Sequence, residues 1–166
     1  MRIFGIDPGI ATVGYGFVEY EGNKFKLMHY GIVKTAAGLP LSQRLLEIAN
    51  DIDELLLRFK PDAVAVEELF FNNNIKTGIH VAHGRGVVLL ECRRMNCPIF
   101  EYTPLQVKQA VTGYGRAEKK QVMEMTRRIL GLEKVPRPDD AADALALTIC
   151  HGHSSGSQGV LTDNSI

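Results

Sequence analysis

The chain has 166 residues, of which 45% are hydrophobic and 23% charged, as expected for one soluble globular domain with a full core. No apolar run approaches the roughly 18 residues of a membrane-spanning helix, and no signal peptide opens the sequence, so we expect a cytoplasmic protein. The formal net charge is zero, which argues against a uniformly basic surface but not against a local one.

Three strands are expected first, over residues 2–7, 12–20 and 25–34. The second and third are rich in aromatic and β-branched residues, and Glu21-Gly22-Asn23-Lys24 between them has the composition of a hairpin turn. Pro8-Gly9 provides the earlier turn. Connections this short favour an antiparallel meander.

The pattern then changes to a helical period. Apolar residues recur at spacings of three and four over 42–59, and Pro61 stops that helix. Residues 63–66 form a short apolar strand typical of a buried parallel pair. After a loop at 70–74 we expect a helix at about 77–95, a strand at 99–102, and helices at 104–111, 117–130 and 140–150.

This order predicts an α/β fold with a five-stranded mixed sheet, a three-strand antiparallel meander plus two parallel strands, flanked by helices on both faces. We expect one domain over 1–153 and a disordered tail over 154–166. Cys92, Cys97 and Cys150 follow no paired spacing and should be reduced. His151 and His153 could bind a metal, but an exposed pair at a helix end is more often incidental.

Two carboxylates end apolar strands. Asp7 precedes Pro8-Gly9, where packing requires no charge, although an Asp there can also cap a turn. Glu67 follows four apolar residues, and a lone buried carboxylate is costly unless it is paired or metal-bound. Glu68 points to the opposite side, so we choose Glu67. The alternative is an exposed Glu67-Glu68 pair at a strand end.

Two further carboxylates, Asp140 and Asp143, lie at i and i+3 on one face of the last helix. Asp139 is expected off that face, as an N-cap. The helix is otherwise small and apolar, so it should pack tightly on the sheet. Stabilisation by the helix dipole is the simpler explanation for acids in a first turn.

Together the four acids are more informative than any one of them. The three segments that carry them can converge at one sheet edge, where α/β proteins place their sites. Four carboxylates repel one another unless cations neutralise them, and oxygen ligands suit magnesium or manganese. A pair of such cations makes water attack a phosphodiester.

The charge distribution also suggests a phosphate-binding surface. Residues 76–137 carry 12 Lys and Arg against 5 Asp and Glu, while 1–75 carry 7 against 10 and 138–166 carry 0 against 4. A basic middle section suits a protein that contacts nucleic acid in one place and holds cations in another. A solvated charged helix surface would give the same counts.

The chain resembles the RuvC family, the bacterial Holliday junction resolvases of ribonuclease H-like fold. The resemblance covers about residues 1–153 and rests on four motifs in order: Gly5-Ile6-Asp7-Pro8-Gly9, Ala65-Val66-Glu67, Gly84-Arg85-Gly86 and Asp140-Ala141-Ala142-Asp143-Ala144-Leu145-Ala146. It implies that Asp7, Glu67, Asp140 and Asp143 bind two Mg²⁺ ions, with Mn²⁺ as a substitute. Some family members have histidine at the position of Asp140.

The resemblance also implies the activity and the partners. A homodimer would bind a four-way DNA junction and nick two opposed strands symmetrically, leaving 5′-phosphate ends. It would act in recombination and repair with the RuvA and RuvB branch-migration proteins. No membrane partner is expected.

Further site residues come from the same resemblance. Phe70 matches an aromatic that stacks on junction bases, and Phe71 could serve instead. Lys108 and Lys119 match basic positions near the scissile phosphate, and both are counted with the catalytic residues. Apart from the resemblance, Lys76, Arg116 and Lys120 are candidates for further phosphate contacts, although surface lysines are usually just solvated.

Gly78, Ala82 and Gly86 form a small-residue stripe on the second helix. The resemblance assigns the dimer interface to this helix, whereas packing against the sheet would explain the stripe equally well. A two-fold dimer would give paired cuts.

Three other functions fit the sequence less well. A nucleotide-binding protein of the actin and hexokinase type would need a second phosphate loop and a longer chain. A related nuclease of the same fold could act on RNA or on other branched DNA. A non-catalytic junction-binding module need not keep all four acids.

Overall fold

We describe the protein from a computed structural model over residues 1–68 and 75–155, using the backbone alone for 75–77. The sheet contains β1 (Arg2–Asp7), β2 (Thr12–Glu21), β3 (Lys24–Lys34), β4 (Ala63–Glu67) and β5 (Ile99–Tyr102). The spatial order is β3-β2-β1-β4-β5. β1 pairs antiparallel with β2 and parallel with β4, so the predicted mixed sheet is confirmed.

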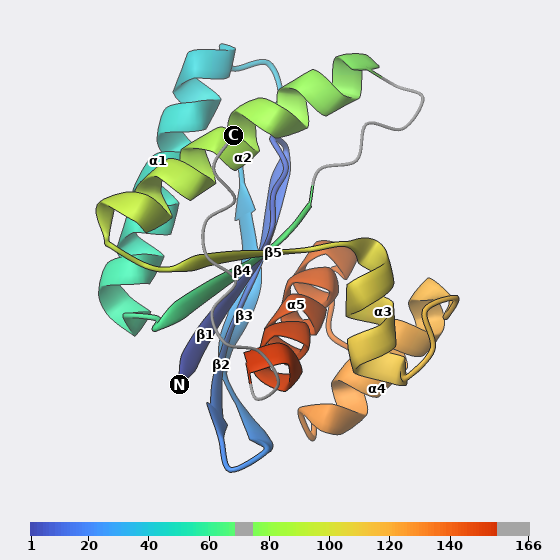
Figure 1. The fold of residues 1–166 in the computed structure, drawn as a ribbon. Helices are drawn as coiled ribbons and strands as arrows, with labels where there is room; N and C mark the ends of the chain where they lie inside the picture. The colour runs from blue at the N-terminus through green and yellow to red at the C-terminus, as the bar shows by residue number, and fades with distance from the viewer. Residues whose placement is uncertain (69–74, 156–166) are drawn as a thin grey trace.

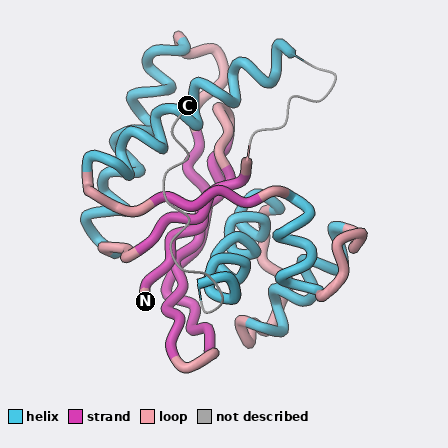
Figure 2. Tube along the Cα trace, viewed as in Figure 1, coloured by secondary structure: helices cyan, strands magenta, loops and turns pink. Residues whose placement is uncertain are grey.

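Helices cover both faces of the sheet, as Figures 1 and 2 show. They are α1 (Leu41–Phe59), α2 (Ile75–Arg94), α3 (Pro104–Thr112), α4 (Lys119–Ile129) and α5 (Asp139–Ser155). α1 and α2 lie on one face, and α5 lies on the other with α3 and α4 packed outside it. The five predicted helices are present, but α5 continues to Ser155, so the predicted tail does not begin at 154.

The turns have local causes in the sequence. Gly22 and Asn23 both have positive φ, 53° and 62°, which is the geometry that a two-residue hairpin turn requires. Thr103 caps α3 by accepting a hydrogen bond from the Gln106 amide, with Pro104 in the first turn as expected. Lys60 closes α1 in the left-handed conformation one residue before Pro61.

Alternating strand residues build a separate core on each face. Phe4, Phe17 and Ile52 belong to the core between the sheet and α1–α2. Ile3 and Leu145 belong to the core between the sheet and α5. Each such side chain, when fully buried, contributes about 1.5–3 kcal/mol by leaving water, so both layers are held firmly to the sheet.

α5 approaches the sheet closely because glycines lie beneath it. A Cβ on Gly5 would stand 2.0 Å from the Ala144 carbonyl oxygen, and one on Gly14 would stand 2.0 Å from the Asp140 carbonyl oxygen. Real Cβ atoms do not come so near to main chain. The helix therefore touches β1 and β2 backbone to backbone, in agreement with the tight packing predicted from its small residues.

α2 makes a similar contact through a different glycine from those of the predicted stripe. A Cβ on Gly84 would lie 2.3 Å from the Gly9 carbonyl oxygen, so α2 touches the turn after β1. A Cβ on Gly86, in contrast, would meet no atom of the described residues within 4 Å. Ile79 and Leu90 on this helix are 48% and 57% exposed. Packing within the chain therefore does not explain Gly86.

The two histidines of α5 differ from the expected exposed pair. His151 is 3% exposed, and its Nδ1 lies 2.7 Å from the Tyr102 hydroxyl. His153 is exposed on a different side of the helix. The expectation failed because α5 runs past both residues and buries the first. Cys92, Cys97 and Cys150 are free and buried, as predicted.

Candidate active site

Asp7 and Glu67 end neighbouring parallel strands. Ile6 is in register with Val66, so the next residue of each strand, Asp7 and Glu67, emerges at the same end of the sheet. Both carboxylates are half-buried, whereas Glu68 is exposed. The charge of Glu67 is one of those that raise the pKa of Asp7.

α5 brings the other two acids to this edge. Gly14 is the β2 partner of Asp7, and the main chain of Asp140 packs directly on Gly14. The missing Cβ of one glycine therefore places the first turn of α5 over the end of β1. Asp143 follows one helical turn later and is half-buried.

The negative charges of the other three acids act on Asp7, and the charge of Asp143 also acts on Glu67. Burial raises the pKa of Asp7 to about 7, helped by the negative charges of Asp143, Glu67 and Asp140 in that order. Burial and the charge of Asp143 likewise raise the pKa of Glu67. Such mutual repulsion in a partly desolvated place is typical of a functional site, since a stable core would avoid it.

Lys119 supplies positive charge at this cluster from the start of α4. Its Nζ lies 2.8 Å from Oδ2 of Asp143 and 3.6 Å from Oδ2 of Asp139. Burial acts to lower the pKa of Lys119, but the hydrogen bond and charge of Asp143, with those of Asp139, outweigh it and raise the pKa. The positive charge of Lys119 opposes the rise in the pKa values of Asp7 and Glu67 but does not cancel it.

Asp139 was missed by the sequence argument, which expected it to be an N-cap off the shared face. It is instead the first residue of α5, and its carboxylate pairs with both Lys119 and Arg137. A usable signal was present, because Asp139 and Asp143 are four residues apart and so share a helix face.

The chemistry of this donor set fits hard divalent cations, which prefer carboxylate oxygens. In this structure, however, the four carboxylates do not form a compact set of metal ligands. In residues 1–68 and 78–155, no three acidic, histidine or cysteine side chains are gathered closely enough to hold one ion.

The remaining residues predicted from the sequence make no ion pair with the four acids in the described part of the chain. Lys108 is half-buried in α3, while Arg116 and Lys120 are exposed beside the start of α4. Lys76 lies in α2, but its side chain is outside the described residues, as are Phe70 and Phe71. For all of these residues a role in binding or catalysis stays a prediction.

Comparison with known proteins decides the family. A family model described as crossover junction endodeoxyribonuclease RuvC matches residues 3–151. The chain belongs to the RuvC family. All four acids, Lys108 and Lys119 lie inside the part that matches this RuvC model.

Individual relatives agree over nearly their whole lengths. The chain is 57% identical over 160 residues to the crossover junction endodeoxyribonuclease RuvC of Alkaliphilus metalliredigens, covering 96% of this chain and 98% of the relative. It is 56% identical over 154 residues to that of Ruminiclostridium cellulolyticum, covering 93% of each.

Solved RuvC structures share the fold. Thermus thermophilus RuvC superposes with a TM-score of 0.88 at 42% identity, covering 94% of this chain and 96% of that one. The same protein in complex with a Holliday junction substrate gives a TM-score of 0.90 at 42% identity, covering 93% and 94%. The ribonuclease H-like fold expected from the sequence is therefore confirmed.

Proposed function

We propose that this protein is an endonuclease that resolves four-way DNA junctions by hydrolysing one phosphodiester in each of two opposed strands. The observation that carries the proposal is the surrounding of Asp7 by Glu67, Asp140 and Asp143, with Lys119 beside them. Membership of the RuvC family supports it, as does the superposition on a relative that is described in complex with a Holliday junction substrate.

The residues of the chain divide into two groups by charge. Asp7, Glu67, Asp140 and Asp143 would hold divalent cations through carboxylate oxygens. When bound, two such cations supply an activated water and neutralise charge at the leaving 3′ oxygen. Lys119, which forms an ion pair with Asp143, would place its ammonium group against the phosphate of the cut strand. Lys108 of α3 is proposed to bind the same phosphate.

Mg²⁺ is the proposed ion, with Mn²⁺ as a substitute, because all four ligands are hard oxygens and none is histidine or cysteine. The half-buried position of Asp7 and Glu67 strengthens the attraction for a cation, since water screens their charges less there than in the open. A site with these properties also discourages a monovalent ion, which would leave most of the repulsion in place.

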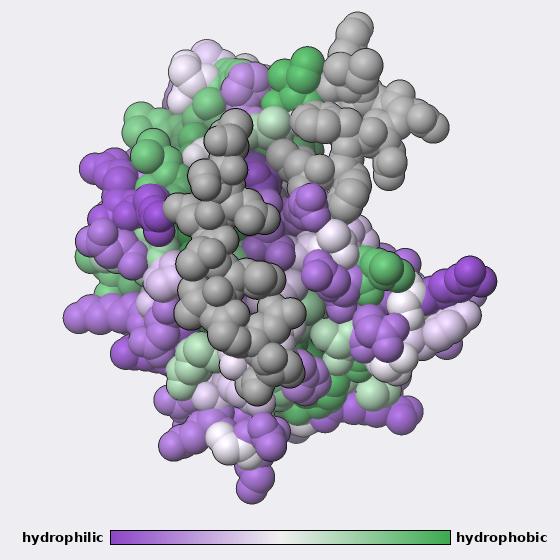
Figure 3. Space-filling model, in the orientation of Figure 1, coloured by the Kyte–Doolittle hydropathy of each residue, from purple (hydrophilic) through white to green (hydrophobic). Residues whose placement is uncertain are grey.

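A homodimer would deliver two symmetric cuts, each ending in a 5′-phosphate. Support comes from α2, where Ile79 and Leu90 are exposed and the surface at Gly86 is open. Such an apolar, close-approach surface suits a second copy better than solvent. Figure 3 shows apolar patches on the side of the molecule where α1 and α2 lie.

The partners and the stacking aromatic rest on family resemblance, and the further phosphate contacts rest on the basic residues themselves. RuvA and RuvB are the proposed partners in branch migration. Phe70, or Phe71 beside it, is proposed to stack on unpaired junction bases, while Lys76, Arg116 and Lys120 contact phosphates.

In the part of the chain that the structure describes, no helix combines the length and hydropathy of a membrane span. A cytoplasmic location stays a prediction.

A cleavage assay with matched substrates tests the function. A labelled synthetic four-way junction is incubated with Mg²⁺ or with a chelator, beside a linear duplex of the same sequence and an RNA–DNA hybrid. Symmetric, ion-dependent nicks in the junction alone are expected. Equal cutting of the duplex or the hybrid would point to another nuclease of this fold, and binding without cutting would point to a junction-binding module.

A further inference from the structure

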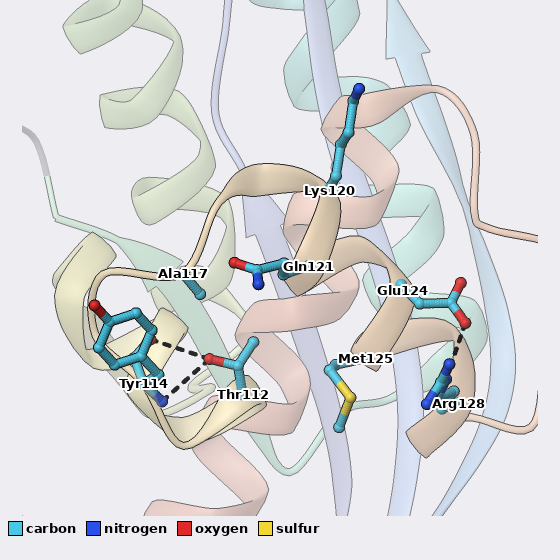
Figure 4. A pocket seen from close by; sticks show the side chains of 8 residues that line it. All are labelled: Thr112, Tyr114, Ala117, Lys120, Gln121, Glu124, Met125 and Arg128. Atoms are coloured by element: carbon cyan, nitrogen blue, oxygen red, sulfur yellow. Dashed lines mark hydrogen bonds and ion pairs between the residues drawn. The ribbon is translucent and has the colours of Figure 1, made fainter.

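An ion pair outside the acid site joins α2 to the edge strand of the sheet. Nη2 of Arg85, on α2, lies 2.8 Å from Oε2 of Glu101, on β5. The side chain of Arg85 is only 12% exposed, whereas that of Glu101 is 48% exposed. The pair of Glu124 with Arg128, in contrast, lies along α4 alone and at the surface, as Figure 4 shows. A largely buried pair between two elements constrains how they lie, which a surface pair within one helix does not.

Stability does not explain the guanidinium group of Arg85. Its Nε and Nη2 atoms are buried and make no hydrogen bond to the described residues, since Glu101 lies close to Nη2 but out of line for one. Buried donors without an acceptor are costly, and an apolar side chain of similar volume is often at least as stable. No ligand reaches either buried atom, so Arg85 acts through its contacts within the protein. Such a side chain is expected where geometry matters more than stability.

Strand pairing does not join the first two acids of the site directly. The β1–β4 ladder ends with Ile6 and Val66, one residue before Asp7 and Glu67. Each acid is instead paired with the strand on its outer side, Asp7 with β2 and Glu67 with β5. The separation of the two carboxylates therefore depends on contacts that hold the end of β5 relative to the end of β1.

α2 provides such contacts from the face of the sheet opposite α5. Gly84 touches the turn after β1, where a Cβ would stand 2.3 Å from the Gly9 carbonyl oxygen. The next residue, Arg85, holds Glu101 near the end of β5. Glu101 is in register with Val66, whose side chain lies in the core beneath α1 and α2. Two successive residues of one helix thus contact the ends of β1 and β5, and β4 lies between these strands.

We propose that Arg85 is a positioning residue for the acid site. Its ion pair with Glu101 fixes β5, and with it the end of β4, against the helix that touches the turn after β1. The pair thereby holds Asp7 and Glu67 at a separation that suits the binding of cations. The inference rests on the proposed nuclease function and adds to it a residue that contacts neither DNA nor the reacting atoms.

Arg85→Met tests the inference, because it removes the ion pair and keeps an unbranched side chain in the same space. We expect the Kd for Mg²⁺, measured by calorimetry without DNA, to rise roughly 10-fold, as when a residue that orients metal ligands is lost. Single-turnover junction cutting at limiting Mg²⁺ should fall by a similar factor, while the Kd for the junction in Ca²⁺ is unchanged. In a chelator the Tm should not fall, because Glu101 stays half-exposed to water.

Two further variants and a control complete the test. Glu101→Gln keeps an acceptor beside Arg85 and should raise the Kd for Mg²⁺ less than Arg85→Met does. The double variant should bind Mg²⁺ as Arg85→Met does, because substitutions on one interaction are not additive. Arg2→Met is the matched control. Nη1 of Arg2 donates to the Phe59 carbonyl oxygen at 3.0 Å, at the end of β1 opposite the acids, so its loss should leave Mg²⁺ binding and cutting unchanged.

The outcomes separate this inference from the function on which it rests. Mg²⁺ binding and cutting by Arg85→Met equal to those of the wild type would overturn the positioning role alone. A lower Tm with equal losses of Mg²⁺ binding and junction binding would also overturn it, since Arg85 would then only support the fold. A wild type that binds Mg²⁺ but cuts no junction would remove the function, and calorimetry would still decide whether Arg85 positions the acids. A wild type that binds no Mg²⁺ would remove the basis of both.

Discussion

The Nζ atom of Lys119 lies 2.8 Å from Oδ2 of Asp143, so a lysine acts as counter-ion to one of the proposed cation ligands. The same ammonium group is 3.6 Å from Asp139, four residues earlier on the same helix. If Asp143 held a cation, Lys119 would lose this partner, and Asp139 would offer its ammonium group a second one. Lys119 would stay beside the site in both states, positioned for a phosphate.

Lys119→Met should lower the rate of junction cutting on the order of 100-fold, as expected for removal of one charged group from a reaction centre. The Kd for the junction should change far less. Single-turnover cleavage and equilibrium binding measure the two effects separately. Lys24→Met, on the distant hairpin turn, serves as control, and a loss of binding as large as the loss of cutting would contradict this role for Lys119.

Asp7→Asn should abolish cutting, with at least a 1000-fold or roughly 4 kcal/mol loss, while junction binding is largely kept. The substitution removes a carboxylate oxygen and no phosphate contact. Titration of Mg²⁺ by calorimetry should show weaker ion binding by the variant. Loss of binding and cutting in the same proportion would argue that Asp7 supports the fold rather than the reaction.

The same Asp7→Asn substitution should stabilise the ion-free protein at neutral and alkaline pH. The pKa of Asp7 is raised from 3.8 to about 7 in the folded state. Folding therefore loses stability as the pH rises from about 4 through 7, by at most about 4 kcal/mol. Urea unfolding in a chelator should show wild type falling below Asp7→Asn across this window. Parallel curves would show that the cluster carries no such penalty.

The sequence predicted the sheet and five helices because their apolar periods are regular and their turns carry Gly, Pro and Asn. It also named the four acids, since charges at the ends of apolar strands and inside a small-residue helix are out of place unless they are used. Asp139 was not found, although its spacing of four residues from Asp143 was a usable signal. Which cations it pairs with, Lys119 of α4 and Arg137, is set by tertiary packing and could not be read from the sequence.

His151 gives a prediction for acid stability. Burial lowers its pKa to about 4, and Tyr102 makes a 2.7 Å hydrogen bond to Nδ1. The unfolded chain takes up a proton near pH 6.5 and the folded chain only near 4, so stability falls as the pH drops through this interval. His151→Asn, which keeps an acceptor for Tyr102, should flatten that decline in urea titrations. An unchanged slope would mean that other groups cause it.

Gly14→Ala should disrupt the site through the backbone. The new Cβ would stand 2.0 Å from the Asp140 carbonyl oxygen, so the main chain of β2 or of α5 must shift. We expect a loss of about 1–3 kcal/mol in stability together with loss of cutting. Gly16→Ala is the matched variant, because its Cβ meets the Leu145 side chain, which can rotate. Equal effects of the two substitutions would show that Asp140 is not positioned by Gly14.

The contact of Gly5 with the Ala144 carbonyl oxygen has a consequence for how this protein can vary. The position of α5, which carries Asp140 and Asp143, is set by where its main chain touches the strands and not by the shapes of side chains between them. Repacking the apolar core with residues of similar volume leaves that spacing intact, whereas a single added methyl group at the contact shifts a whole helix. Substitutions should therefore be tolerated at core positions more readily than at Gly5 and Gly14, which lie beneath α5.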